Sequence, residues 1–232
     1  MENKVVGVIG GMGPMATAKF MELVINNTKA LKDQDNVDML VCNYASIPDR
    51  TSYILGDSNE NPAQNMIKAA KQLEKMNCSF IVMPCNTATY FYDEIKKSIN
   101  IPFLNIVHET VKYCISNKAK KIGLMATDGT IESKVYEQYI PDDIELFLPN
   151  KDIQAKIMDI IYGEIKQNII PNKERFLSVL NYFKENNCDC IIMGCTELSV
   201  AIIELNIKDE MIVDSLTVLA KETIKKAGKL LK

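Results

Sequence analysis

The chain has 232 residues, of which 47% are hydrophobic and 25% are charged, so it can bury a sizeable core as one large α/β domain or two small ones. Its formal net charge is −3 and its Lys and Arg residues are spread among acids, which argues against a nucleic-acid partner. The sequence shows no signal peptide and no apolar run of membrane-spanning length, so we expect a cytoplasmic protein with no membrane association.

The cysteine and histidine usage bears on disulfides and metals. The chain has seven cysteines, and an odd number in a cytoplasmic protein does not suggest a disulfide framework. His108 is the only histidine and no CxxC pair occurs, so we expect no metal site. Five of the cysteines lie within or before apolar runs and are expected to be buried structural residues: Cys42, Cys78, Cys114, Cys188 and Cys190.

Short apolar runs alternate with helical stretches along the first half of the chain. Continuous apolar strands flanked by helices indicate a parallel sheet that is covered on both faces. In chain order we predict a strand at 5–9, a helix at 15–31, a strand at 39–42, a helix at 64–76 and a strand at 80–83.

The same alternation then restarts without a Pro/Gly/Ser-rich linker. His108 lies near the start of a helix that follows a short strand at 103–104, and we expect a surface or interface role for it. The next predicted elements are a strand at 121–125, a helix at 175–186 and a strand at 191–193.

Two segments of the chain repeat one another. Residues 77–87 and 187–197 each contain Asn-Cys, a strand and Met-x-Cys, at a constant spacing of 110 residues (188 − 78 and 195 − 85). The first strands of the two halves correspond only roughly, with Gly7 matching Gly123. A repeat of this length indicates two similar α/β domains related by pseudo-twofold symmetry, each a mostly parallel sheet flanked by helices. We expect the first domain to comprise 1–100 plus 210–232, the second 101–209, and the active site to lie in the cleft between them.

Cys85 and Cys195 occupy equivalent positions, just past a strand and immediately before a predicted helix. Ligands bind beyond the carboxyl ends of parallel strands, and a helix N-terminus both lowers a thiol pKa and attracts carboxylates. Both cysteines lie in polar turns that no packing argument requires. Two thiols across one cleft suit removal of a proton from carbon on one face and its return on the other, with hydrogen bonds from Asn86, Thr87, Thr196 and backbone N–H groups.

At these residues the sequence resembles the aspartate/glutamate racemase superfamily, most closely the aspartate racemase branch. The resemblance implies two α/β domains with one cysteine from each in the cleft. It also implies racemisation without PLP, metal or nucleotide, and a homodimer. Four motifs carry it, in the expected order: Gly-Gly-Met-Gly-Pro-Met-Ala-Thr at 10–17, Pro-Asp-Arg at 48–50, Pro-Cys-Asn-Thr-Ala at 84–88 and Gly-Cys-Thr-Glu-Leu at 194–198.

Carried over residue by residue, the resemblance makes Cys85 and Cys195 the acid/base thiols. Arg50 would bind a side-chain carboxylate. Lys166 would reach the same site, with a solvated helix charge as the alternative. Glu197 would meet the substrate ammonium or a neighbouring amide, or would only be a first-turn helix acid. The residues implied to line the α-carboxylate and backbone side of the substrate are Met12, Asn86, Thr87, Ala88, Thr127 and Thr196.

The expected activity is therefore a cofactor-independent racemase of L- and D-aspartate, with glutamate as a further candidate substrate. Thr89 stands where aspartate racemases commonly carry His, which bears on substrate preference and rate. Two alternatives stay open: a related isomerase or decarboxylase of small carboxylates, similar to maleate isomerase or hydantoin racemase, and a non-catalytic binding protein for acidic amino acids.

A nucleotide-binding enzyme is a third, disfavoured alternative. Gly11-x-Gly13-x-x-Ala16 follows a strand and opens a helix, which is close to a dinucleotide fingerprint. Pro14 interrupts it, however, and the second strand ends in Asn43-Tyr44 without an acid for a ribose.

Overall fold

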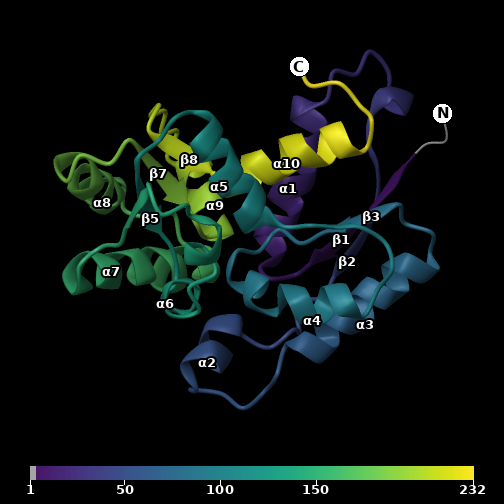
Figure 1. Cartoon of the computed structure of the whole chain (residues 1–232), viewed down its shortest axis with the longest axis horizontal. Coiled ribbons are helices and arrows are strands. Elements are labelled where there is room, and N and C mark those ends of the chain that lie inside the picture. Colours follow the sequence, from purple (N-terminus) through teal and green to yellow (C-terminus); the bar gives the residue numbers. More distant parts are fainter. Residues whose placement is uncertain (1–3) are drawn as a thin grey trace.

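Two four-stranded parallel sheets form the framework of the protein, one in each of two lobes (Figure 1). The computed structural model describes residues 4–232. The strand orders are β2-β1-β3-β4 and β6-β5-β7-β8, so the second sheet repeats the topology of the first and the predicted class of two α/β domains is confirmed. The strands are β1 (Val5–Gly10), β2 (Asp38–Asn43), β3 (Phe80–Val82), β4 (Phe103–Leu104), β5 (Lys121–Met125), β6 (Glu145–Phe147), β7 (Cys190–Met193) and β8 (Ile212–Asp214).

Helices flank both sheets. The matched pair α3 and α8 has the same 110-residue spacing as the two cysteine motifs, as duplicated halves require. No helix among residues 4–232 is long and apolar enough to cross a membrane. The helices are α1 (Pro14–Asn27), α2 (Arg50–Leu55), α3 (Ala63–Lys75), α4 (Tyr92–Lys97), α5 (Ile106–Ser116), α6 (Asp128–Glu132), α7 (Lys151–Met158), α8 (Lys173–Glu185), α9 (Thr196–Glu204) and α10 (Ser215–Lys226).

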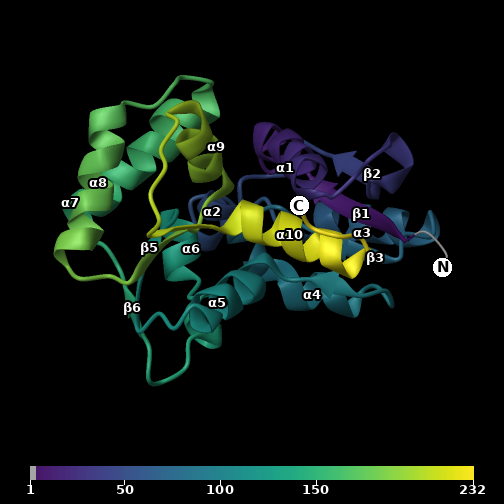
Figure 2. The ribbon, with the colours of Figure 1, turned by 90° about the horizontal axis from the view of Figure 1, so that it is seen from above.

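The hydrophobic core has three parts. One cluster packs α3 against the first sheet, through Leu73 and Ile81, and a second packs α8 against the second sheet, through Phe183 and Ile191. The third joins the lobes, because it contains side chains of β1 and α1 together with side chains of β5 and α10. Helix α10 packs along α1 and α5 where the lobes meet (Figure 2). This shared core holds the two sheets in a fixed relation, while the predicted domain boundaries stay a prediction.

Helix α1 ends four residues earlier than predicted, at Asn27 instead of residue 31. Thr28 is fully buried and extended, its hydroxyl donates to the Val24 carbonyl at 2.7 Å, and its backbone forms an antiparallel bridge with Leu231. Backbone groups near Thr28, which a longer helix would have bonded within itself, thus form hydrogen bonds with the C-terminal segment instead. Helical periodicity reports only local spacing and does not reveal a contact between residues as distant in sequence as Thr28 and Leu231, so the predicted end of this helix was wrong.

Two further expectations concern residues away from the cleft. The predicted helix near His108 is α5, and the half-exposed His108 ring lies 5.2 Å from that of Tyr139. Among the five cysteines expected to be buried, Cys42 is only partly buried, because it lies on β2 at the edge of its sheet. The other four are buried as expected.

Candidate active site

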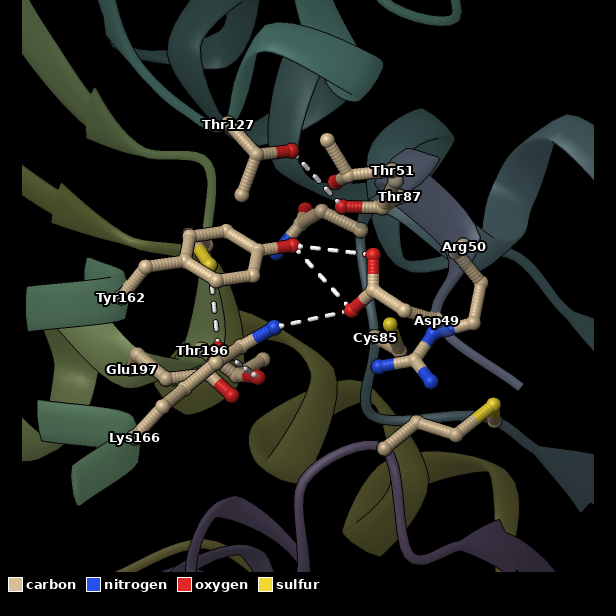
Figure 3. Close-up of a pocket in the computed structure, with 13 residues that line it drawn as sticks. Asp49, Arg50, Thr51, Cys85, Thr87, Thr127, Tyr162, Lys166, Thr196 and Glu197 are labelled. Carbon is tan, nitrogen blue, oxygen red and sulfur yellow. Dashed lines mark hydrogen bonds and ion pairs between the residues drawn. The ribbon is translucent and has the colours of Figure 1, made fainter. Parts of the chain in front are cut away.

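A pocket lies between the lobes, beyond the carboxyl ends of β3 and β7, where parallel sheets bind ligands (Figure 3). Both Cys85 and Cys195 line it. Every residue that the sequence analysis placed in the site lines this pocket except Ala88, which is fully buried. The lining residues are Met12, Asp49, Arg50, Thr51, Cys85, Asn86, Thr87, Thr127, Tyr162, Lys166, Cys195, Thr196 and Glu197.

The two cysteines precede different kinds of helix. Cys195 is the N-cap residue of α9 and has an extended backbone. Cys85 is followed by a 3₁₀ helix, Thr87–Phe91, and only then by α4, whereas we predicted a helix directly after each cysteine. The intervening residues are β-branched or aromatic apart from Ala88, and such residues favour an α-helix only weakly. Both turns nevertheless present backbone N–H groups close to a thiol.

The thiols are buried in unlike electrostatic surroundings. Each cysteine is 5% exposed. Burial raises the pKa of Cys85, while the Arg50 guanidinium and the backbone N–H of Ala88 oppose that rise. Ala88 therefore acts on the Cys85 thiol through its backbone N–H and not through its side chain. Burial raises the pKa of Cys195 well above its ordinary value, and the Glu197 carboxylate raises it further, since the Cys195 Sγ donates to Glu197 Oε2 at 3.0 Å.

Arg50 is the first residue of α2 and is 8% exposed. Asp49 caps this helix by accepting a hydrogen bond from Ser52 N at 2.9 Å. The Arg50 Nη1 donates to the carbonyls of Ile47 (3.3 Å) and Pro48 (3.0 Å), whereas the buried Nε has no hydrogen-bond partner in the described part of the chain. A buried unpaired donor is costly. The loop therefore fixes the guanidinium and leaves it a donor for an acceptor in the pocket.

A second cation reaches the pocket from the opposite lobe. Lys166 belongs to a 3₁₀ turn, Ile165–Gln167, and its Nζ lies 3.2 Å from Asp49 Oδ2 and 3.7 Å from the centroid of the Tyr162 ring. Burial alone would lower the pKa of Lys166, but Glu197, Tyr162 and Asp49 raise it above its ordinary value. Lys166 is thus a partly buried cation of the site and not a solvated helix charge.

Asp49 connects the two lobes across the pocket. The Tyr162 hydroxyl donates to its two carboxylate oxygens at 3.2 Å each, and Figure 3 shows Tyr162 and Lys166 approaching Asp49 together. The free volume left inside is about 10 Å³, room for about one water, so an amino acid enters only after these side chains move. An adjoining cavity of about 370 Å³ shares Asp49, Arg50, Lys166 and Glu197 with the pocket.

Three lining residues were missed by the sequence analysis: Asp49, Thr51 and Tyr162. Asp49 could have been predicted from the sequence, because it lies within the Pro-Asp-Arg motif at 48–50. Tyr162 lies in a π-helical stretch, Asp159–Glu164, which helical periodicity does not predict. Thr89, the departure from the family pattern, does not line the pocket but a separate cavity beside Tyr90 and Tyr139.

Hydroxyl groups from both lobes meet at the pocket wall. The Thr87 Oγ1 lies 3.0 Å from Thr127 Oγ1 and 2.8 Å from Thr130 Oγ1, within hydrogen-bond distance of each. Thr127 caps α6 by accepting from Thr130 N. Within residues 4–232 no group of three or more His, Cys, Asp or Glu side chains is arranged to hold a metal ion.

Asn86 is held by a buried hydrogen-bond chain that joins the two cysteine loops. Its Oδ1 accepts from the Tyr136 hydroxyl at 2.7 Å and its Nδ2 donates to Ser215 Oγ at 2.9 Å. Ser215 donates in turn to the carbonyl of Met193, two residues before Cys195, at 2.7 Å. All three hydrogen-bonding side chains are at most 1% exposed. The chain fixes the Asn86 amide and leaves one N–H for a ligand.

Removal of the Tyr136 hydroxyl tests this chain. We expect Tyr136→Phe to lower the free energy of unfolding by about 1–3 kcal/mol, because Asn86 Oδ1 loses its buried partner. Urea denaturation measures the difference. Tyr113→Phe, on the outer face of α5 where Tyr113 is 43% exposed, is the matched control and should change stability by less than about 0.5 kcal/mol. Equal stability of the two variants would contradict the assigned role of the hydroxyl.

Comparisons with known proteins agree with this architecture. The profile of the Asp/Glu/hydantoin racemase family matches residues 9–223. The broad specificity amino-acid racemase of Bacillus subtilis is 31% identical over 227 residues, covering 94% of this chain and 96% of its own. The solved aspartate racemase of Picrophilus torridus is 33% identical with a TM-score of 0.86, covering 99% of this chain and 96% of its own. A glutamate racemase from Francisella tularensis, solved with D-glutamate, shares the fold at 20% identity and a TM-score of 0.64, over 97% and 81% of the two chains.

Proposed function

The chain belongs to the Asp/Glu/hydantoin racemase family and is an amino-acid racemase, and we propose that it interconverts L- and D-aspartate by two-base proton transfer between Cys85 and Cys195. One observation carries the proposal: two buried cysteines, from equivalent strand ends of the two lobes, line one pocket together with Arg50 and Lys166. Glutamate is the second candidate substrate.

The proposed reaction moves two protons. The thiolate of one cysteine removes the α-proton, and the thiol of the other delivers its own proton to the opposite face of the α-carbon. The negative charge that develops spreads into the α-carboxylate, which the N–H groups at the start of α9 and the Thr87 and Thr196 hydroxyls stabilise. Proton removal and return leave the oxidation state unchanged, so the proposed reaction needs no redox cofactor, and we propose that the two thiols carry out both proton transfers without PLP.

The buried Arg50 and the partly buried Lys166 favour a substrate with two carboxylates. We assign the side-chain carboxylate to Arg50, whose Nε has no hydrogen-bond partner among residues 4–232. A substrate carboxylate can also replace that of Asp49 at Lys166 and so separate Asp49 from it as the pocket opens. Glu197 provides a negative charge for the substrate ammonium. Met12, Asn86 and Thr127 complete the wall around the backbone of the substrate, and the main chain of Ala88 supports Cys85.

We propose aspartate as the substrate because the similar P. torridus enzyme is an aspartate racemase. The similar B. subtilis enzyme is a broad specificity amino-acid racemase, so a wider panel of amino acids should also be tested as substrates. The homodimer and the cytoplasmic location stay predictions.

Proton NMR of L-aspartate in D₂O, with reductant and no added cofactor, tests the proposal. We expect the α-proton signal to disappear, and chiral chromatography to show D-aspartate, because the returning hydrogen comes from solvent-exchanged thiol. A variant with serine at both Cys85 and Cys195 is the control and should show neither change. If neither enantiomer of aspartate or glutamate exchanges, the proposed substrate is wrong, and the other amino acids of the wider panel take its place.

A further inference from the structure

The repeat that places the two thiols differs at one chemically important position. Cys85 is followed two residues later by Thr87, whereas Cys195 is followed two residues later by Glu197. The turn that carries Cys85 therefore has a neutral hydroxyl at this position, whereas the turn that carries Cys195 has a carboxylate. A symmetric pair of acid/base groups would not need this difference.

Glu197 is 6% exposed and lies in the first turn of α9. Its Oε2 accepts from Cys195 Sγ at 3.0 Å and also lies 3.4 Å from Thr196 Oγ1. The first of these bonds exists only while Cys195 carries its proton. A Cys195 thiolate would instead face a carboxylate at the same short distance, in a site from which water is largely excluded.

Burial raises the pKa of Cys85 as well, and Glu197 adds to that rise, but two neighbouring groups oppose it. The Arg50 guanidinium and the Ala88 backbone N–H both stabilise a negative sulfur there. The other charged or titratable groups that face Glu197 or Cys195 are Lys166 from the turn after the π-helical stretch, Arg50 from α2, Cys85 itself and Tyr136 from the segment after α6. Lys166 favours a Cys195 thiolate, but less strongly than Glu197 disfavours it.

We propose that Glu197 is a positioning residue that keeps the proton on Cys195 in the resting enzyme, so that Cys85 is the resting base. The proposal rests on the two-base function proposed above. In a turnover that starts from this state, the Cα–H bond breaks as Cys85 gains a proton, and the Cys195 S–H bond breaks as the opposite face of the α-carbon gains one. The enzyme is then left with a Cys195 thiolate beside Glu197. It returns to rest when solvent takes a proton from Cys85 and supplies one to Cys195.

Site-resolved alkylation tests the order in which the thiols ionise. The probe is iodoacetamide, a small neutral reagent that attacks only the thiolate. Mass spectrometry measures the alkylation rate of each cysteine from about pH 6 to about pH 11. Each rate is divided by the maximum rate of that cysteine at high pH, so that a difference in how easily the reagent reaches the two thiols does not affect the comparison. In the unchanged protein we expect Cys85 to reach half its plateau at a lower pH than Cys195.

The variant Glu197→Gln keeps the shape of the side chain and removes its charge. We expect it to shift the Cys195 midpoint down by about one pH unit, which is about tenfold more thiolate at a given pH, and to shift Cys85 less. Glu204→Gln is the matched control, because Glu204 is the exposed last residue of the same helix and should leave both midpoints unchanged. A change of packing alone would not move a midpoint selectively at Cys195.

Two results would overturn the proposal: a Cys195 midpoint at or below that of Cys85 in the unchanged protein, or an unchanged Cys195 midpoint in Glu197→Gln. The first needs no variant and does not depend on the variant folding. Measurement of α-proton exchange on the same preparations separates the two hypotheses. Exchange with the reversed order of ionisation refutes the role of Glu197 and keeps the racemase. The expected order without exchange of aspartate or glutamate refutes the proposed substrates, while the control of the Cys195 proton by Glu197 is upheld.

Discussion

Replacement of either Cys85 or Cys195 by serine is expected to slow the interconversion of the two enantiomers by about 10²–10⁴-fold, the usual contribution of a general acid or base. Serine is close to cysteine in shape but is a far weaker acid at the same place. Each cysteine is needed in both directions, once as a base and once as an acid. Chiral chromatography of L- and D-aspartate reactions measures the loss.

The two variants should differ in a way that a single-base enzyme could not reproduce. With serine at position 195, Cys85 can still remove the α-proton of one enantiomer and return a deuteron to the same face. We therefore expect α-deuterium exchange without inversion for one enantiomer only, and for the other enantiomer when serine replaces Cys85. Cys42→Ser, a partly buried cysteine on β2 outside the pocket, is the control and should retain full activity. Full racemisation by either active-site variant would eliminate the two-base mechanism.

The second large effect is expected at Arg50. Arg50→Lys keeps the positive charge but loses the planar fork that binds a carboxylate through two parallel hydrogen bonds. Loss of one partner of a buried, charged hydrogen-bonded pair costs about 2–5 kcal/mol, so kcat/KM for aspartate should fall about 30- to 5,000-fold. The single ammonium nitrogen of lysine also cannot bind the loop carbonyls of Ile47 and Pro48 and hold a carboxylate through a planar pair of hydrogen bonds at the same time.

Steady-state kinetics with L- and D-aspartate measures the expected fall in kcat/KM of Arg50→Lys. The chain offers one matched control for this variant. Arg175, the only other arginine, lies on α8 in ion pairs with Asp159 and Glu164 and does not line the pocket. Arg175→Lys should leave kcat/KM within about twofold of the unchanged protein, since partly exposed ion pairs contribute little. If the two variants lose activity equally, Arg50 has no special part in substrate binding.

Much of the framework followed from local patterns. Apolar runs and helical spacing predicted β1, β2, β3, β5 and β7 together with α3 and α8, because burial of one face imposes a period on the sequence. The repeat of Asn-Cys and Met-x-Cys predicted two equivalent sheets, and the position of each cysteine after a strand predicted one shared cleft, since parallel strands end at the same edge.

The tertiary structure decided what faces each of those residues. Asp49 meets Tyr162 across 113 positions of sequence, and Asn86 meets Ser215 across 129, and neither pair has a signal in periodicity or spacing. The same holds for the early end of α1, where the C-terminal segment takes over Thr28. The sequence determined by itself that two thiols follow two equivalent strands, because strand pattern and motif are local properties. Only the fold placed Arg50 beside Cys85 and buried Glu197 with its carboxylate on the Cys195 thiol, because the energy of a charge depends on its neighbours in space and on their burial.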